Sequence, residues 1–473
     1  MKAAPKSPQD LLQANVKSHL QDLMELMKIP SISFEGFPVS EMERSGDAVA
    51  ALLKKRGLEN VEIFRLPGAF PFVYGDYCHA PGKPTLLLYA HHDVQPAGNP
   101  ERWSSPPFEP TLREGPGGMR LYGRGAADDK AGIVLHTAAI ASFLEAGQEL
   151  PVNVKVIIEG EEECGSSHLE GFLKKYRSRL DADVLVIADM GNFDIGVPAL
   201  TMALRGIVGV HIEVSGLDKS VHSGMWGGPV PDPAMALSKM LASLVDDQGR
   251  IAIPGVLEQV EPLSEAERRE FARIPYREED FRKQSGMLPG SEILGGALED
   301  GISPMVRLFR KPSLTVNAIE ASSRLTAGNI INRSAWSKVT IRLVAGMDPE
   351  KVLAQLKAHL AKHTPWGMEL KITGEAASPA WSTQMKGPAF DAAYAALERG
   401  YGKAPLTLGS GGSIPFVRSF SDALGGVPAL LVGVEDPYTN AHGENESVGV
   451  SDFEKGCLSH IYLFEELAKR WGK

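Results

Sequence analysis

The stretch TLLLYAHHD, residues 85–93, is an apolar run that ends in two histidines and an aspartate. A run of this length is typical of a buried strand. Three further apolar runs are followed by similar residues: Val152–Ile158 by EGEEE at 159–163, Val184–Ile187 by Asp189, and Ala429–Val434 by HGENE at 442–446. Because ligands bind at the carboxyl ends of strands in open α/β sheets, we expect these side chains to face one crevice.

Helical segments alternate with these runs. The glycine-rich turn GRGAADDK, residues 123–130, leads into Ala131–Leu144, which has the length and composition of a helix. A first helix is expected between Ser7, a capping residue, and Pro30, which ends its apolar pattern. Strands that alternate with helices predict an α/β domain with a largely parallel sheet.

The middle of the chain has a different pattern. The elements expected there are a strand at 208–214, a helix at Pro233–Val245, a strand at 339–343, a helix at 348–363 and a strand at Met368–Ile372. This order predicts a ferredoxin-like α+β unit inserted into the α/β domain. The expected domains are 1–205 and 380–473 for the two parts of the α/β domain and 206–379 for the insertion.

Composition limits the class of protein. The 473 residues exceed the roughly 250–300 that one core supports, so two domains are expected. A formal net charge of -10 does not suit nucleic acid, which binds basic surfaces. The three cysteines form no CxxC pair, and neither a signal segment nor an apolar run of ~18 residues is found. We therefore expect a soluble, cytoplasmic protein without disulfide bonds that binds neither nucleic acid nor membrane.

So many carboxylates and imidazoles in one crevice require a compensating charge, because carboxylates placed together raise each other's pKa. Histidine nitrogens mixed with carboxylate oxygens suit zinc or manganese. A carboxylate shared by two ions is the basis of a two-metal hydrolytic site. Each residue alone has an ordinary explanation, since single histidines are often structural and Glu-rich runs are often solvated. Their repeated position at strand ends favours the metal site.

Three motifs, in this order, resemble the M20 family of metallopeptidases and, within it, the carnosinase-like dipeptidases. They are HHDVQP at 91–96, GRGAADDK at 123–130 and EECGS at 162–166. The resemblance covers nearly the whole chain. It implies a zinc-peptidase-like α/β catalytic domain with an inserted ferredoxin-like dimerisation (lid) domain, a small peptide substrate and a homodimer. It also implies two divalent metal ions, zinc in the first place and manganese as the alternative.

The resemblance gives each matched residue of the α/β domain a role. The implied metal ligands are Asp128 as the bridge, His91 and Asp189 on one ion, and Glu163 and His442 on the other. Asp93 would hold the imidazole of His91 in its ligating tautomer. Glu162 would be the general base, which moves a proton from the attacking water to the leaving amine. The family also has a cis peptide where Asp128 precedes Asp129 here.

In the inserted domain, VHSG at 221–224 resembles the segment whose histidine, here His222, polarises the scissile carbonyl from the partner subunit. Asn329 and Arg342 stand where the family has substrate-binding residues. An arginine there can bind a terminal carboxylate through two hydrogen bonds.

The segment that begins with Gly412 and Ser413 resembles the family's backbone cradle for the substrate carboxylate. Just before it, Gly409 and Ser410 replace the Arg-Glu pair that the family often has, which leaves the choice of substrate open. Ala131 replaces a glycine after the second motif, and this change is compatible with the metal site.

Several functions remain possible at this stage. A dipeptidase, an N-acyl-amino-acid deacylase or desuccinylase, and a carboxypeptidase share this arrangement of residues. An inactive metal-binding scaffold is a non-enzymatic alternative, although the intact Glu162 argues against it. A serine hydrolase built on GSGG at 409–412 is disfavoured because the aspartate expected before the serine is missing. A nucleotide site at Gly123 and Gly125 lacks its third glycine.

Overall fold

The structure, a computed structural model, describes residues 6–295, 301–411 and 416–471. It divides into two compact units, which are described separately. The first consists of Met1–Met202, Gln384–Leu408 and Phe416–Lys473, and the second of Ala203–Thr383 and Gly409–Pro415. The chain thus leaves the first unit, builds most of the second and then returns.

The largest sheet in the described chain has nine strands in the order β1-β2-β6-β3-β7-β17-β8-β15, with β16 paired to β8. Their bounds are β1 Glu59–Phe64, β2 Phe72–Tyr77, β3 Thr85–His91, β6 Asn153–Glu159, β7 Val184–Ile187, β8 Ala199–Leu204, β15 Trp381–Ser382, β16 Leu406–Ser410 and β17 Ala429–Leu431. The inner pairs β6–β3, β3–β7 and β7–β17 are parallel. The pairs β1–β2, β2–β6, β17–β8 and β8–β15 are antiparallel.

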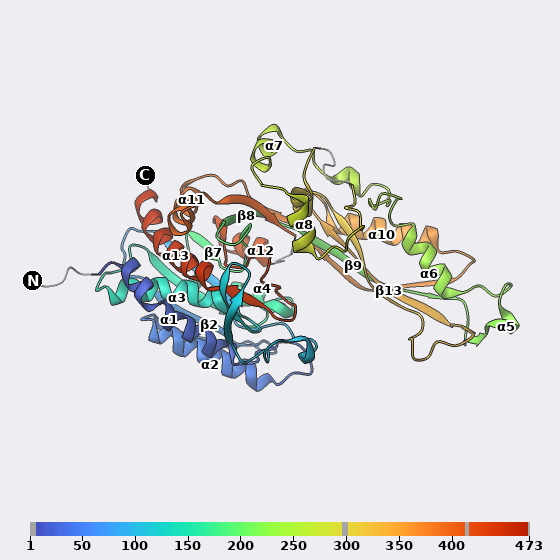
Figure 1. Cartoon of the computed structure of the whole chain (residues 1–473), viewed down its shortest axis with the longest axis horizontal. Coiled ribbons are helices and arrows are strands. Elements are labelled where there is room, and N and C mark those ends of the chain that lie inside the picture. Colours follow the sequence, from blue (N-terminus) through green and yellow to red (C-terminus); the bar gives the residue numbers. More distant parts are fainter. Residues whose placement is uncertain (1–5, 296–300, 412–415, 472–473) are drawn as a thin grey trace, which may run out of the picture. The chain divides into compact units, whose positions relative to one another are not determined.

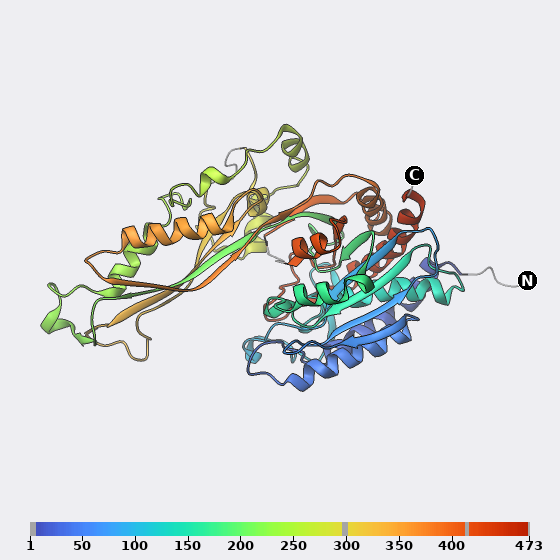
Figure 2. The same cartoon turned by 180° about the vertical axis from the view of Figure 1, so that it is seen from behind.

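Helices cover both faces of this sheet (Figures 1 and 2), with α3 and α13 on one face and α4 and α12 on the other. The helices of the first unit are α1 Pro8–Met27, α2 Val39–Lys55, α3 Lys130–Glu145, α4 Leu169–Leu180, α11 Pro388–Tyr401, α12 Phe416–Ala423 and α13 Val450–Arg470. A central strand between two helical layers is buried on both sides, which explains why β3 is apolar throughout.

Two of these helices illustrate how the sequence fixes their position. Ser7 caps α1 in a reciprocal hydrogen-bonded pair with Asp10, as expected from the residues that precede it. Helix α3 is buried on almost every side because it packs against α1, α13 and β3. Its N-terminus follows the glycine-rich turn directly, so the turn is held against the core.

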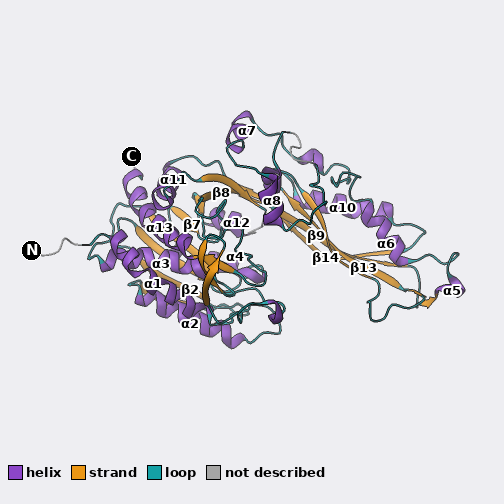
Figure 3. Ribbon diagram, in the orientation of Figure 1, coloured by secondary structure: helices purple, strands orange, loops and turns teal. Residues whose placement is uncertain are grey.

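The second unit has its own core and a four-stranded antiparallel sheet in the order β11-β13-β9-β14. The strands are β9 Gly206–Ser215, β11 Ser313–Glu320, β13 Ser334–Leu343 and β14 Glu369–Ser378, and helices α6 Pro233–Ala242 and α10 Pro349–His363 pack on β9 (Figure 3). The order β9-α6-β11-β13-α10-β14 is that of a ferredoxin-like fold.

Smaller elements complete both units. They are η1 Pro100–Arg102, β4 Thr111–Gly115, β5 Gly118–Tyr122, η2 Glu162–Cys164 and β18 Ser447–Gly449 in the first unit, and β10 Val221–His222, α5 Ser223–Trp226, η3 Leu257–Gln259, α7 Glu265–Phe271, α8 Glu278–Ser285, α9 Pro304–Arg310 and β12 Ile330–Ile331 in the second. Helices α7 to α9 lie in the Pro- and charge-rich stretch between α6 and β11.

The predicted fold class, an α/β domain with an inserted α+β domain, is confirmed. The prediction for the insertion was incomplete, because it lacked β11. Two predicted elements extended too far towards the carboxyl terminus. Strand β17 ends at Leu431 rather than Val434, and helix α6 ends at Ala242 rather than Val245. All three cysteines are free thiols. None of the helices in the described residues has the length and apolar character needed to cross a bilayer.

Candidate metal centre

The predicted ligands of the first unit come together at the carboxyl end of the parallel strands. His91 ends β3, Glu162 and Glu163 lie in η2 just after β6, Asp189 follows β7, Asp128 precedes α3, and His442 lies between β17 and β18. Because β6, β3 and β7 are parallel neighbours, their carboxyl ends meet at one edge of the sheet. These side chains therefore lie at one edge of the sheet, as the prediction of a shared crevice requires.

The carboxylate of Asp128 lies between two imidazoles. Its Oδ1 is 3.1 Å from Nε2 of His91, and its Oδ2 is 2.9 Å from Nε2 of His442. The same nitrogen of His442 is 3.2 Å from Oε2 of Glu163. The peptide between Asp128 and Asp129 is cis, as predicted. Asp128 thus has one oxygen available on each side, which is what a carboxylate shared by two cations requires.

The protonation of His91 follows from its other contacts. Its Nδ1 is 3.1 Å from the main-chain oxygen of Asp93 and 3.3 Å from the Asp93 carboxylate. Because a carbonyl oxygen can only accept, Nδ1 carries the hydrogen. In the protein alone Nε2 donates to the Asp128 carboxylate, which helps to raise the pKa of His91 well above its ordinary value. A cation that replaces this hydrogen would meet the lone pair of Nε2, because the Asp93 contacts keep the remaining hydrogen on Nδ1.

Asp93 also fixes the segment that carries the two glutamates. Its Oδ1 accepts a hydrogen bond from the main-chain N–H of Glu162 at 3.2 Å, and its Oδ2 accepts one from that of Glu163 at 3.0 Å. The hydroxyl of Ser33 donates to Oδ2 at 2.7 Å. A single buried carboxylate therefore orders His91 and both glutamates.

The two glutamates have different surroundings. Gln95 donates to the Glu163 carboxylate twice, from its main-chain N–H at 3.1 Å and from its side-chain Nε2 at 2.8 Å. No donor among the described residues makes a hydrogen bond to the carboxylate of Glu162, whose closest ion-pair contact is Nε2 of His91 at 4.0 Å. Glu163 is thus held in place, whereas the Glu162 carboxylate is free to exchange a proton.

The electrostatics of the cluster reflect the crowding of buried acids. Burial, together with the neighbouring carboxylates, raises the pKa of Glu162 to about 8 against the opposing effect of His91. Burial and Asp129 raise the pKa of Asp189 well above its ordinary value. Hydrogen bonds to Asp128 and Glu163 raise the pKa of His442 to about 11. In the protein alone, the raised pKa values favour protons that offset the negative charge of the cluster. Divalent cations can take the place of those protons.

The donor atoms fit such cations. Two sets, His91 with Asp128 and Glu163, and His91 with Asp129 and Asp189, each have ligand atoms that lie within 4.8 Å of one another. Imidazole nitrogen with carboxylate oxygen, and no thiolate, is a suitable donor set for zinc or manganese. Asp129 was not among the predicted site residues. Its Oδ2 accepts from the main-chain N–H of His91 at 3.2 Å, and its buried Oδ1 has no hydrogen-bond partner within residues 6–295, 301–411 and 416–471.

Glu446 is a second residue that the sequence did not single out. Its Oε2 accepts from Arg124 at 2.8 Å and from the main-chain N–H of Gly125 at 3.0 Å. Its Oε1 accepts from the N–H groups of Ala127 at 3.0 Å and Asp128 at 3.2 Å. The segment after β17 therefore holds the turn that presents Asp128. The only signal in the sequence was its place in HGENE at 442–446.

The remaining predicted residues belong to the second unit. His222 ends β10, and its Nδ1 accepts from the N–H of Gly224 at 3.0 Å, so its Nε2 is the nitrogen that carries a hydrogen in the neutral ring. Asn329 precedes β12, and its main-chain oxygen accepts from Ser223 at 2.9 Å. Arg342 lies near the end of β13, where burial lowers its pKa. Gly412 and Ser413 lie outside the described residues.

A search with protein-family profiles matches residues 87–466 to the description "Peptidase family M20/M25/M40". The chain belongs to this family. The resemblance inferred from the motifs is confirmed, and the metal-ligand types gathered at the strand ends are those of a metallopeptidase. An M20 peptidase is a hydrolase that acts on peptide bonds.

Named relatives of this M20 chain are dipeptidases. It is 35% identical over 393 residues to a cysteinylglycine-S-conjugate dipeptidase of Corynebacterium striatum, with 82% of each chain covered. It is 32% identical over 467 residues to a Cys-Gly metallodipeptidase of Schizosaccharomyces pombe, with 94% of each covered. A Beta-Ala-His dipeptidase of Rattus norvegicus is 31% identical over 407 residues, covering 84% of this chain and 80% of the relative.

Solved structures agree with this M20 assignment. A di-peptidase of Saccharomyces cerevisiae superposes with a TM-score of 0.85 at 27% identity and covers 99% of both chains. Human carnosine dipeptidase 1 superposes with a TM-score of 0.84 at 28% identity, covering 98% of this chain and all (100%) of the other. Both similarities extend over the α/β domain and the insertion.

Proposed function

We propose that this M20 peptidase hydrolyses the amide bond of dipeptides or dipeptide-like substrates, as a cytoplasmic homodimer that holds two divalent ions, zinc in the first place and manganese as the alternative. The observation that carries the proposal is the Asp128 carboxylate between His91 and His442, beside a Glu162 carboxylate that receives no hydrogen bond from the part of the chain that the structure describes. The three free cysteines suit a reducing compartment.

Asp128, His91, Asp189, Glu163 and His442 would hold the two ions: Asp128 would be shared, His91 and Asp189 would serve one ion, and Glu163 and His442 the other. When bound, the ions polarise the scissile carbonyl and lower the pKa of the attacking water. Bound cations would offset the negative charge of the cluster, so that Glu162 would enter the reaction as a carboxylate.

Glu162 then acts as the general base. Its carboxylate accepts a proton from the attacking water and delivers that proton to the nitrogen of the leaving amine. Asp93 supports this role through the main chain, because it accepts the N–H of Glu162 and orients His91 at the same time. The two adjacent glutamates thus have different roles: Gln95 holds the carboxylate of Glu163 in place, and Glu162 moves the proton.

The second unit contributes the substrate-binding groups. The hydrogen on Nε2 of His222 can donate to the carbonyl oxygen as negative charge develops there. In the proposed homodimer this histidine serves the partner's site. Arg342 and Asn329 bind the substrate, together with the backbone cradle that begins at Gly412 and Ser413. Relatives named for Cys-Gly and Beta-Ala-His substrates support dipeptides as the substrate class.

A substrate panel tests the proposal. Metal-quantified enzyme would be assayed with dipeptides, with N-acyl and N-succinyl amino acids, and with longer peptides that have a free carboxyl terminus. We expect the highest kcat/KM on dipeptides and full loss of activity with a chelator, restored by zinc or manganese. A preference for the acyl amino acids or for longer peptides would instead identify a deacylase or a carboxypeptidase. Absence of turnover on the whole panel would favour the metal-binding scaffold.

A further inference from the structure

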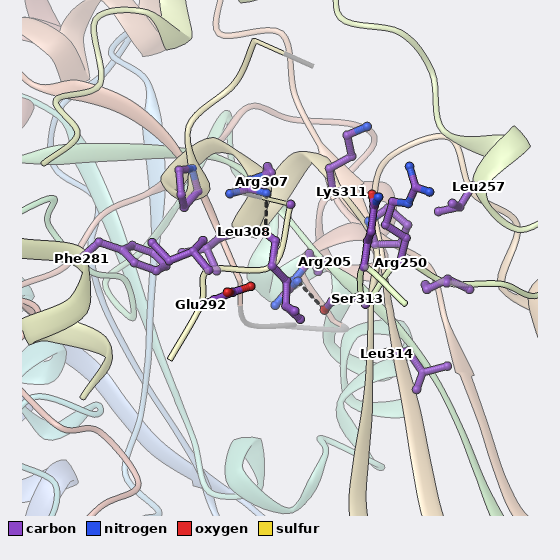
Figure 4. Close-up of a pocket in the computed structure, with 18 of the residues that line it drawn as sticks. Arg205, Arg250, Leu257, Phe281, Glu292, Arg307, Leu308, Lys311, Ser313 and Leu314 are labelled. Carbon is purple, nitrogen blue, oxygen red and sulfur yellow. Dashed lines mark hydrogen bonds between the residues drawn. The ribbon is translucent and has the colours of Figure 1, made fainter. Parts of the chain in front are cut away.

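A cavity of about 510 Å³ lies within the second unit, outside the ferredoxin-like core (Figure 4). Its wall is built by the residue that joins β8 to β9, by the turn at 248–251, by α8 and α9, and by the start of β11. Among the described residues, none of the proposed metal ligands or substrate-binding residues lines it. A volume in the range of about 300–1,000 Å³ is typical of a site for a small organic molecule.

The charges at this cavity are mainly positive. Four basic side chains, Arg205, Arg250, Arg307 and Lys311, line it together with one carboxylate, that of Glu292. Arg250 is paired with Asp246 at 2.8 Å, which compensates its charge. Arg307 donates to the main-chain oxygen of Leu294 at 2.7 Å. Whether the cavity favours an anion therefore depends on Arg205.

Arg205 is the basic residue whose charge lacks compensation. It donates to the main-chain oxygen of Gly411 at 2.9 Å and to the hydroxyl of Ser313 at 3.0 Å, and both acceptors are neutral. No carboxylate among the described residues lies within ion-pair distance of its guanidinium. Burial, with a further contribution from Arg342, lowers its pKa to about 10. A largely buried cation without a counter-ion is costly, and an anion bound beside it would remove that cost.

The rest of the wall is apolar. Figure 4 shows Arg205 beside Ser313 near the middle of the cavity, with Phe281 on one side and Leu257 on the other. Leu308 and Leu314 contribute further apolar surface. A ligand that matches this wall has an apolar body about the size of an aromatic ring with a short chain, and a single anionic group that can reach Arg205.

We propose that this cavity is a binding site for an organic anion with an apolar body, anchored by its anionic group on the guanidinium of Arg205. The site is separate from the metal centre in its residues and does not depend on the proposed peptidase activity.

Calorimetric titration of the full-length, metal-loaded protein tests the proposal with three probes. The first is 4-phenylbutyrate, the second is 4-phenylbutylamine, which has the same body with a positive charge, and the third is acetate, which has the charge without the body. We expect saturable binding of 4-phenylbutyrate, at least about tenfold weaker binding of acetate, and no binding of the amine. Equal binding of the amine and the carboxylate would overturn the proposal, since Arg205 would then play no part.

Carboxylates also bind metal ions, so the titration is repeated after chelation. Binding in the proposed cavity persists without metal, whereas binding that disappears on chelation belongs to the metal centre and contradicts the proposal. Hydrogen exchange provides the location. We expect 4-phenylbutyrate to slow exchange at residues 248–251 and 304–314; protection confined to other segments would place the ligand elsewhere.

Two variants complete the test. Leu308→Trp fills the cavity from a residue that is 43% exposed and should abolish binding of 4-phenylbutyrate. Leu325→Trp, at a residue that is 98% exposed and outside the wall, is the matched control and should bind like the wild type. Arg205→Gln removes the charge and should weaken binding by about tenfold or more, the factor that corresponds to one charge-assisted hydrogen bond. Unchanged affinity in Leu308→Trp would overturn the proposal whether or not Arg205→Gln folds.

Discussion

Glu162 and Glu163 are neighbours in the chain, but their carboxylates are bound differently, and this difference determines what each can do. Gln95 donates twice to Glu163, while the described residues offer Glu162 no hydrogen-bond donor. A carboxylate that must move a proton has to rotate and accept that proton without losing a fixed partner. A carboxylate that binds a metal ion profits from the opposite, a rigid and hydrogen-bonded position.

The first prediction follows for the two glutamates. Glu162→Gln should lower kcat by about 10²–10⁴-fold, because the amide cannot accept the proton, while two metal ions remain bound. Glu163→Gln should lose metal, because a ligand is removed. Activity is measured on a dipeptide, and metal content by elemental analysis after gel filtration. Glu170→Gln, on the exposed surface of α4, is the control. Equal loss of metal in both site variants would exclude Glu162 from the role of base.

A second prediction concerns Gln95, which holds Glu163 without being a proposed ligand. Gln95→Met keeps the size of the side chain and removes the donor to Oε2 of Glu163. Changes of this kind at groups that orient a ligand typically weaken metal binding by about 10–100-fold. Competition with a chromophoric chelator measures the affinity. The variant should regain full activity at high metal concentration, and an affinity equal to that of the wild type would show that the main-chain donor alone suffices.

The residues that were predicted at this scale are those that lie in short motifs directly after strands, such as His91 and Asp189. Glu446 and Asp129 escaped prediction for a physical reason. Glu446 acts by accepting hydrogen bonds from residues more than 300 positions away, and nothing in its own neighbourhood shows that contact. Asp129 directly follows Asp128, and nothing in two adjacent acids indicates that both place ligand atoms near His91.

At the scale of elements, the packing of α3 against α13 makes the first unit sensitive to acid. His136 of α3 and His460 of α13 are buried, and their ring centroids are 5.0 Å apart. Burial lowers the pKa of His136 to about 3 and that of His460 to about 4, from a value of 6.5. Between about pH 4 and pH 6.5, these two histidines therefore bind protons in the unfolded chain but not in the folded chain.

The third prediction is therefore a loss of stability on acidification. The free energy of unfolding should fall as the pH drops from about 6.5 towards 4, by up to about 1.4 kcal/mol per pH unit for each histidine. Above pH 7 both rings are neutral in both states and contribute no slope. His460→Phe should give a smaller slope below pH 6.5 in urea titrations and the same slope as the wild type between pH 7.5 and 8.5. Identical slopes at acid pH would contradict the assignment.

Elements with a regular burial pattern were the ones that the sequence predicted. Strand β7 is apolar at every position, and β9 is apolar at alternate positions. The predicted ends of both strands lie within two residues of the observed ends. Strand β11 was missed although Leu314, Val316 and Ala318 alternate with polar residues. Most of its side chains are exposed, so the alternation marks no buried face. It is a strand because β13 pairs with it along its whole length, which is information that lies in its neighbour.

At the scale of the whole molecule, the proposed homodimer leads to a fourth prediction. Glu162→Gln and His222→Ala subunits should each be nearly inactive alone. Mixed dimers contain one site with an intact Glu162 from one subunit and an intact His222 from the other. After subunit exchange, roughly a quarter of all sites should be active. Dipeptide turnover after mixing, with exchange verified by mass spectrometry, is the measurement.

The control for this experiment replaces Glu162→Gln by the double variant Glu162→Gln with His222→Ala. Its mixture with His222→Ala contains no intact His222 and should stay inactive. If verified exchange restores no activity in the first mixture, His222 acts within its own subunit or has no part in the reaction.

The position of β17 in the sheet has a consequence for how the protein is made. β17 pairs in parallel with β7, although the segment between Ile187 and Ala429 is longer than many whole domains. At about 5–20 residues per second, a ribosome needs roughly 12–50 s to synthesise that segment. During this time β7 has no partner on one edge, and His442 has not yet been added. With the proposed ligand set, a nascent chain cannot complete its metal centre before residue 442 has been synthesised, so peptide-cleaving activity should begin only after that point.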